Sequence, residues 1–273
     1  MIKNRIKNCF SNLKKNEKSA LIAFMTAGDP DYTTSLKLIN AMPKAGVDII
    51  ELGMPFSDPM ADGPIIQRSY IRALKSGSSL LKTLDLVKHF RENNQYTPII
   101  LMGYFNPIYQ MGVKKFFKKA KSFGVDGILI VDLPPESINE LSTEFLENSV
   151  DLIRLVNPTS SKNRIKKISE LASGFLYYVS ITGITGSNIT KLSNIKKSYI
   201  SLKKNIKLPF VVGFGINSIE KAKEISSYSD GVVVGSDLVK EIELGIKNNG
   251  NIYNNVIKLV KKYSKAIKEN KKW

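Results

Sequence analysis

The sequence predicts an α/β protein in which eight strand–helix units close into a single-domain (β/α)8 barrel. Short runs of β-branched and apolar residues alternate with longer segments that repeat apolar residues at helical spacing. Two runs, 128–131 and 232–234, are apolar at every position, as expected of parallel strands buried on both faces. An open doubly wound sheet is the alternative, but no G-x-G-x-x-G follows the first strand.

Each expected strand is a short apolar run that leads into a loop and then a helical segment. The expected strands are 20–25, 47–52, 98–102, 126–131, 151–156, 175–180, 210–213 and 231–234. The expected helices between them include 33–45, 80–92, 114–123, 136–148, 162–172, 189–204 and 219–227. Gly-Val-Asp closes a helix and opens a strand at 46–48 and again at 124–126, where glycine supplies the left-handed cap.

The two ends of the chain predict helices beyond the eight units. Ile2, Ile6, Phe10 and Leu13 recur at helical spacing, so residues 1–16 are expected to form a helix that caps the bottom of the barrel. Residues 252–267 predict a final amphipathic helix, and 268–273 are expected to be a loose tail. No low-complexity linker interrupts the chain, so residues 1–273 are expected to form one domain.

The composition argues against nucleic-acid and membrane roles. The chain carries 41 Lys and Arg against 24 Asp and Glu, a net charge of +17. Lysines recur on nearly every expected helix, and Asn and Ile are abundant beside them. We therefore interpret the positive charge as compositional drift from AT-rich coding and not as a nucleic-acid surface. The positive field would still attract an anionic substrate. No run reaches the ~18 apolar residues of a membrane span, and the start lacks the apolar core of a signal peptide. A cytoplasmic protein is therefore expected.

The chain has a single cysteine, Cys9, and a single histidine, His89. These counts exclude an internal disulfide and make a zinc site or a Ser-His-Asp apparatus improbable, so no metal is expected. His89 falls in the amphipathic helix expected over 80–92, and we interpret it as a helix-surface residue. The chemistry is therefore expected to come from carboxylates, tyrosines and the backbone.

Segment 51–64 (ELGMPFSDPMADGP) carries the strongest chemical signal. Glu51 falls at the C-terminal end of an expected strand, and Asp62 falls in the loop that follows among Met, Pro and Phe side chains. An apolar environment at a strand end separates the pKa values of two carboxyls, as acid–base catalysis requires. The alternative is a salt-bridged or capping glutamate beside a turn aspartate.

The loops after the last strands indicate a phosphate site. Barrels of this type often bind phosphate on the loops after strands seven and eight, and Gly213, Gly215 and Gly235 allow backbone N–H groups to approach an anion. Ser236 begins an expected helix whose N-terminus favours negative charge. No Lys or Arg lies inside these loops, so backbone donors are expected to bind the anion. The alternative is that the glycines only allow tight turns and bind no anion. Loop 182–188, which holds Thr185, is expected to be a lid or else a plain connection.

Taken together, these segments resemble the tryptophan synthase alpha chain family. The resemblance rests on 51–64 and on segments 24–30 (FMTAGDP), 101–107 (LMGYFNP), 131–134 (VDLP), 178–186 (YVSITGITG) and 213–216 (GFGI). It runs from about residue 24 to residue 239 in the family order and spacing. Ile181 departs from the pattern, since some members have arginine there.

The resemblance implies a carbon–carbon lyase (an aldehyde-lyase) that cleaves indole-3-glycerol phosphate to indole and glyceraldehyde 3-phosphate without a cofactor. It implies that Glu51 is the general acid/base and that Asp62 pairs with the indole N–H. It further implies a substrate site made by the residues Phe24, Ile66, Tyr104, Leu129, Tyr177, Thr185, Gly186, Phe214, Gly215, Gly235 and Ser236. Within that set, Phe24, Ile66 and Leu129 form the indole slot, and Gly186, Gly215, Gly235 and Ser236 hold the phosphate.

The resemblance also implies a partner. Family members work as heterotetramers with a beta chain, which carries pyridoxal phosphate and joins the transferred indole to L-serine to make L-tryptophan. The loop at Asp58, Pro59 and Met60 resembles the part that faces that partner. A stand-alone lyase that releases free indole and a barrel kept only to activate the beta chain remain alternatives. A different phosphate-binding barrel is disfavoured by segment 58–62 and by the lack of a strand-end lysine.

Overall fold

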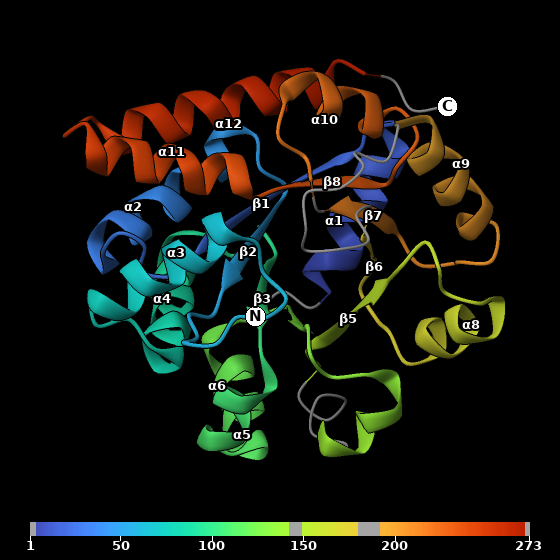
Figure 1. Ribbon diagram of the computed structural model, residues 1–273, viewed down its shortest axis with the longest axis horizontal. Coiled ribbons are helices and arrows are strands. Elements are labelled where there is room, and N and C mark those ends of the chain that lie inside the picture. Colours follow the sequence, from blue (N-terminus) through green and yellow to red (C-terminus); the bar gives the residue numbers. More distant parts are fainter. Residues whose placement is uncertain (1–3, 142–148, 180–191, 214, 271–273) are drawn as a thin grey trace.

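Eight parallel strands form a closed barrel in the order of the sequence, β1 to β8, in the computed structural model of the chain (Figure 1). The structure describes residues 4–141, 149–179, 192–213 and 215–270. The register closes where Ala20 of β1 pairs with Gly231 of β8. The strands are β1 (Ala20–Thr26), β2 (Ile49–Gly53), β3 (Ile99–Gly103), β4 (Gly127–Ile130), β5 (Asp151–Val156), β6 (Leu176–Val179), β7 (Phe210–Gly213) and β8 (Gly231–Val234).

Helices surround the strands (Figure 1). They are α1 (Arg5–Lys15), α2 (Tyr32–Ala41), α3 (Pro64–Lys75), α4 (Leu80–Asn93), α5 (Phe105–Met111), α6 (Val113–Phe123), α8 (Lys162–Glu170), α9 (Leu192–Lys203), α10 (Ile219–Ser226), α11 (Ser236–Lys247) and α12 (Ile252–Lys268), with 3-10 helices η1 (Pro43–Ala45) and η2 (Pro135–Leu141). None of the described helices combines the length and apolarity that crossing a membrane requires.

The eight-stranded barrel confirms the predicted fold class, and the strand alternation explains the apolar runs. In β1, Ile22 and Phe24 face the barrel interior, whereas Leu21 and Ala23 pack in the layer between the strands and the helices. Both layers exclude water, so neither face of the strand needs polar residues. The cluster inside the barrel contains residues of all eight strands that share this inward alternation.

The structure differs from the predicted elements in three places. Helices α3 and α5 were not predicted; α3 begins with Pro64 at its first position, a start signal that precedes the buried Ile66, Ser69, Tyr70 and Ala73. The helix predicted over 33–45 is divided into α2 and η1, because Pro43 has no N–H to continue the ladder. Of the helix predicted over 136–148, the described part is the 3-10 helix η2.

The predicted glycine caps are present at two helix ends. Gly46 has φ 100° after η1, and Gly124 has φ 88° after α6. Both lie in the left-handed region that glycine adopts without steric cost. The aspartate two residues later then binds the neighbouring strand, since Asp48 accepts from the N–H of Leu21 at 2.7 Å and Asp126 from that of Ile99 at 2.8 Å.

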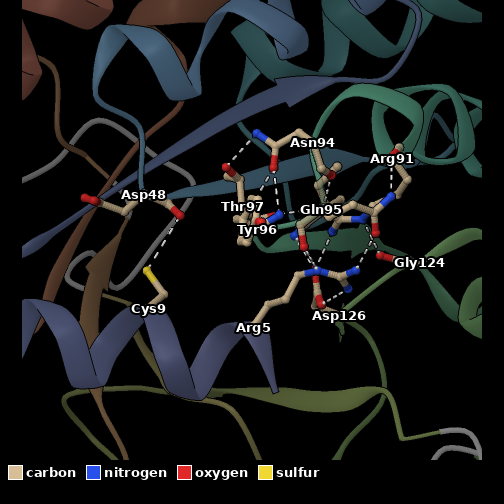
Figure 2. Close-up of polar contacts among 11 residues, drawn as sticks. Arg5, Cys9, Asp48, Arg91, Asn94, Gln95, Tyr96, Thr97, Gly124 and Asp126 are labelled. Atoms are coloured by element: carbon tan, nitrogen blue, oxygen red, sulfur yellow. Dashed lines mark hydrogen bonds and ion pairs between the residues drawn. The ribbon is translucent and has the colours of Figure 1, made fainter. Parts of the chain in front are cut away.

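Helix α1 contacts the N-terminal ends of the strands. The guanidinium of Arg5 binds Asp126, which precedes β4, and Cys9 Sγ lies 3.6 Å from the carbonyl oxygen of Asp48, which precedes β2 (Figure 2). Phe10 packs against Phe175 at 5.6 Å between ring centroids. Helix α1, which falls within the helix predicted over 1–16, therefore lies across the end of the barrel opposite to the loops that follow the strands.

The C-terminal helix is fixed to the same end of the barrel. Lys268 is the last residue of α12, and its Nζ lies 2.5 and 2.6 Å from the two carboxylate oxygens of Asp48. Asn270 Nδ2 donates to Ser226 Oγ at 3.2 Å. Two residues of the tail predicted to be loose, Lys268 and Asn270, thus bind other parts of the chain, and 271–273 lie outside the described residues.

Candidate active site

Glu51 projects from β2 into the barrel, where its side chain is fully buried. Its neighbours in the register are Phe24 of β1 and Ile100 of β3, both apolar residues of the interior. Neither carboxyl oxygen of Glu51 has a hydrogen-bond partner within the described part of the chain. Burial, and secondarily the charge of Asp62, raises the pKa of Glu51 to about 8, so the carboxyl is protonated near pH 7.

Asp62 lies at the end of the β2–α3 loop, two residues before the first helical residue, Pro64. Tyr104 Oη donates a hydrogen bond to Asp62 Oδ2 at 2.6 Å and accepts one from the N–H of Ala61 at 3.0 Å. Burial raises the pKa of Asp62 to about 6, and the hydrogen bond from Tyr104 opposes that rise. Asp62 is therefore largely ionised at pH 7 whereas Glu51 is neutral, the separation that the sequence predicted.

The two carboxyls line one cavity at the C-terminal ends of the strands. The cavity opens to solvent. Its lining residues come from β1, β2, β3, β6 and β8, from the loops after β2, β7 and β8, and from the first turns of α3 and α11: Phe24, Glu51, Asp62, Ile66, Met102, Tyr177, Gly215, Ile216, Val233, Gly235 and Ser236. Eight of the predicted site residues are thus brought together around one space.

Three lining residues, Met102, Ile216 and Val233, were missed by the sequence analysis. Met102 and Val233 could have been found from the two-residue alternation of a strand, because Met102 follows the inward Ile100 by two positions. Ile216 follows the Gly215 turn, and no sequence period marks it. Thr185, Gly186 and Phe214 lie outside the described residues, so their predicted roles are not placed.

Tyr104 and Leu129 were predicted to contact substrate, and neither is among the residues that line the cavity. Tyr104 is the hydrogen-bond partner of Asp62, and its ring packs on Phe56 at 5.3 Å between centroids. Leu129 pairs with Met102 across β3 and β4 and is fully buried in the barrel interior. Met102 of β3, the strand that pairs with the strand of Glu51, lines the cavity.

Glycines at the strand ends make room for the aromatic rings of the cavity. A Cβ at Gly213 would lie 2.1 Å from Tyr177 Cε1, and a Cβ at Gly53 would lie 2.7 Å from Phe24 Cζ. No side chain fits at either position while the rings keep their places. Gly213, which the sequence suggested for anion binding, leaves room for the ring of Tyr177 and is not among the residues that line the cavity.

The part of the cavity lined by Gly215, Gly235 and Ser236 has the features of an anion site. Gly215, with φ 69°, and Gly235 bring backbone to the cavity surface, and Ser236 is the first residue of α11. No side chain caps the N-terminus of α11, so its first N–H groups and the positive end of its dipole are directed toward this end. The cavity thus combines an acid–base pair on an apolar wall with backbone donors for a negative group.

Asp58, Pro59 and Met60 belong to the loop between β2 and α3, in which Asp58 and Met60 are exposed. Met60 is 71 % exposed. The loop continues directly into Asp62, so a contact made by this loop would be transmitted to the site over a few residues. No group of three or more His, Cys, Asp or Glu side chains that could hold a metal occurs among the described residues.

The fold and this cavity define a class, the (β/α)8 barrels that carry their site on the loops at the C-terminal ends of the strands. The profile of one family, described as tryptophan synthase alpha chain, matches residues 10–268. The structure of tryptophan synthase subunit alpha from Legionella pneumophila str. Paris is 38 % identical with a TM-score of 0.92, over 97 % of this chain and 99 % of that one. Tryptophan synthase from M. tuberculosis, in an aminoacrylate-bound form, is 29 % identical with a TM-score of 0.85 over 97 % and 99 % of the two chains.

This chain belongs to the tryptophan synthase alpha chain family. The match extends beyond the motifs of the sequence analysis, so it includes the second half of α1 and the whole of α12. Family membership supports a lyase role.

Proposed function

We propose that this chain is the alpha subunit of a tryptophan synthase and cleaves indole-3-glycerol phosphate to indole and glyceraldehyde 3-phosphate. The observation that carries the proposal is the pair of buried carboxyls on one cavity, with the pKa of Glu51 at about 8 and that of Asp62 at about 6. A retro-aldol cleavage needs one proton donor and one anion at pH 7, and this pair provides both.

In the proposed reaction, neutral Glu51 donates its proton to C3 of the indole ring. Ionised Asp62 accepts a hydrogen bond from the indole N–H and stabilises the positive charge that the ring then carries. The carbon–carbon bond breaks and its electron pair returns to the ring, while the side-chain hydroxyl becomes the aldehyde. The Glu51 carboxylate takes the hydroxyl proton, which restores the starting protonation state.

The remaining walls suit the two ends of this substrate. Phe24, Ile66 and Met102 form an apolar slot beside the carboxyls. The strand-end glycines leave room for the rings of Phe24 and Tyr177. The N-terminus of α11 at Ser236 lies at the other end, where the phosphate would bind. The burial of Glu51 keeps its carboxyl protonated near pH 7.

We further propose that a beta chain binds at the loop of Asp58, Pro59 and Met60 and receives the indole. The exposure of Met60 and the direct continuation of this loop into Asp62 support a contact that alters activity. The chemistry assigned to this chain uses its own carboxyls, and pyridoxal phosphate would belong to the beta chain. The comparisons do not favour a stand-alone lyase.

The test is indole release from indole-3-glycerol phosphate by the purified chain, with and without a matching beta chain, beside Glu51→Gln. We expect slow release that the beta chain accelerates and that Glu51→Gln abolishes. Fast release that is indifferent to the beta chain would indicate a stand-alone lyase. A folded chain that releases no indole under either condition would leave only an activating role toward the beta chain.

A further inference from the structure

We propose that Lys221 is a further substrate-binding residue, whose ammonium group contacts the phosphate at the Gly215–Ser236 end of the cavity. The inference rests on the proposed function and adds a cation to a site that the sequence assigned to backbone donors alone. Lys221 lies outside the strand-end loops in sequence, and only the fold brings its side chain to them.

Lys221 lies in the first turn of α10. Ser218 is the N-cap residue, and its Oγ accepts from the N–H of Lys221 at 3.2 Å, which fixes Lys221 in the first turn. From this position the side chain folds back, and Nζ donates a hydrogen bond to the carbonyl oxygen of Gly215. Gly215 lines the cavity together with Gly235 and Ser236, so the ammonium group lies next to the cavity wall.

The charge of Lys221 is not compensated by the protein. No carboxylate of the described residues lies within 4.0 Å of its Nζ. Two other partly buried lysines differ in this respect, since Lys203 lies 2.6 Å from Asp230 and Lys268 lies 2.5 Å from Asp48. A partly desolvated cation without a counter-ion costs free energy that an anion bound nearby would recover.

The surroundings of Lys221 also favour an anion. Burial lowers the pKa of Lys221, with no opposing contribution from a nearby acid. The one acidic residue in the first turn of α11, Asp237, accepts a hydrogen bond from Tyr263 of α12 at 2.6 Å. Lys221 and the positive end of the α11 dipole therefore act on the same end of the cavity.

A structural alternative exists, in which Lys221 only braces the turn after β7 through the carbonyl of Gly215. Removal of a brace would weaken binding of all substrates and lower the melting temperature. Removal of a phosphate contact would weaken only ligands that carry a phosphate. The two roles are thus separated by comparing phosphorylated and unphosphorylated ligands on the same variants.

The experiment compares Lys221→Met and Lys221→Arg with Lys223→Met, a matched control that removes one exposed charge from the same helix. Binding of glycerol 3-phosphate and of inorganic phosphate is measured by calorimetry, and KM and kcat are measured for indole-3-glycerol phosphate. We expect Lys221→Met to weaken glycerol 3-phosphate binding by about 10- to 100-fold, the loss of one charge-assisted hydrogen bond. KM should rise with kcat nearly unchanged, because the phosphate is remote from the reacting carbon.

Lys221→Arg should restore most of the binding, and Lys223→Met should leave it unchanged. Unphosphorylated indole-3-glycerol should be cleaved equally by the wild-type chain and Lys221→Met. Unchanged glycerol 3-phosphate binding in Lys221→Met, or an equal loss in Lys223→Met, would overturn the inference. Because binding is measured without turnover, tight glycerol 3-phosphate binding in a chain that releases no indole would refute the proposed function alone.

Discussion

Tyr104 Oη donates a 2.6 Å hydrogen bond to Oδ2 of Asp62, so a residue of the β3–α5 connection holds a carboxyl of the β2–α3 loop. The hydrogen bond stabilises the charged form of Asp62 against a burial effect that raises its pKa to about 6. Tyr104 is itself fixed by the N–H of Ala61. The ionisation of Asp62 at neutral pH therefore depends on a contact between two loops.

Tyr104→Phe should shift the acid limb of the kcat/KM profile to higher pH. The substitution removes a hydrogen bond that lowers the pKa of Asp62, so that pKa should rise from about 6 by up to roughly one pH unit. Since the ionised carboxylate is the proposed active form, activity at pH 6 should fall more than activity at pH 7.5. The exposed Tyr109→Phe is the control, and an acid limb that stays in place in folded Tyr104→Phe would contradict the assignment.

Glu51→Gln should stabilise the fold, increasingly so as pH rises. The pKa of Glu51 is raised from 4.5 to about 8 by burial, so the contribution of Glu51 to stability is complete below pH 4.5 and is lost as pH rises to about 8. Glutamine does not ionise and escapes this loss, which should amount to several kcal/mol, roughly 3 or more, at pH 8.5. Urea unfolding at pH 5 and pH 8.5 measures the difference.

The control for this prediction is Glu170→Gln on the exposed surface of α8, which should not follow the same pH dependence. A stability difference between Glu51→Gln and the wild-type chain that is equal at both pH values would mean that Glu51 is already ionised in the folded chain. In that case the proposed proton donor to the indole ring would have to be another group.

Gly213→Ala should displace the ring of Tyr177 from the cavity wall. An added Cβ would lie 2.1 to 2.3 Å from Cε1, Cζ and Oη of Tyr177, so the ring or the strand must move. We expect a loss of about 1 to 3 kcal/mol of unfolding free energy from overpacking, together with a raised KM. Gly250→Ala is the matched control, since the nearest atoms there lie at 3.8 Å and far from the site. Normal KM and stability in Gly213→Ala would show that the ring is free to move.

Asp126→Asn should unfold the chain more easily without altering the cavity. Asp126 lies between two buried guanidinium groups, with Arg5 Nη1 at 2.9 Å and Arg91 Nη2 at 2.6 Å (Figure 2). Burial lowers the pKa of Arg91 to about 10, which the charge of Asp126 opposes. Loss of the shared carboxylate leaves two buried cations without a counter-ion, a cost of about 3 to 5 kcal/mol.

Urea unfolding of Asp126→Asn is compared with Glu136→Gln, whose exposed ion pairs with Arg164 and Lys167 should contribute nothing measurable. An Asp126→Asn variant as stable as the wild-type chain would show that carbonyl groups alone solvate the two arginines. Arg91 also donates to the carbonyl oxygens of Gly124, Asn94 and Thr97 (Figure 2), so these carbonyls are the groups that would stabilise its charge in the absence of Asp126.

By itself, the sequence predicted the barrel and singled out Glu51 and Asp62, the two carboxyls to which the proposed chemistry is assigned. The eight apolar runs predict strands buried on both faces because a parallel barrel strand contacts apolar layers on each side. Gly46 and Gly124 mark two helix ends because only glycine enters the left-handed region freely. Glu51 and Asp62 are close in sequence, so a strand and its loop suffice to place them together.

Only the tertiary structure decided which contacts surround the two carboxyls and the cavity. Tyr104 meets Asp62 across 42 positions of sequence, and Lys221 reaches Gly215 because α10 turns its first residues back toward the end of β7. No local period signals such contacts, since they depend on how neighbouring strands are staggered and how each loop returns to its helix. The pKa values of the two carboxyls likewise follow from burial, which the closure of the barrel creates and the order of residues alone does not fix.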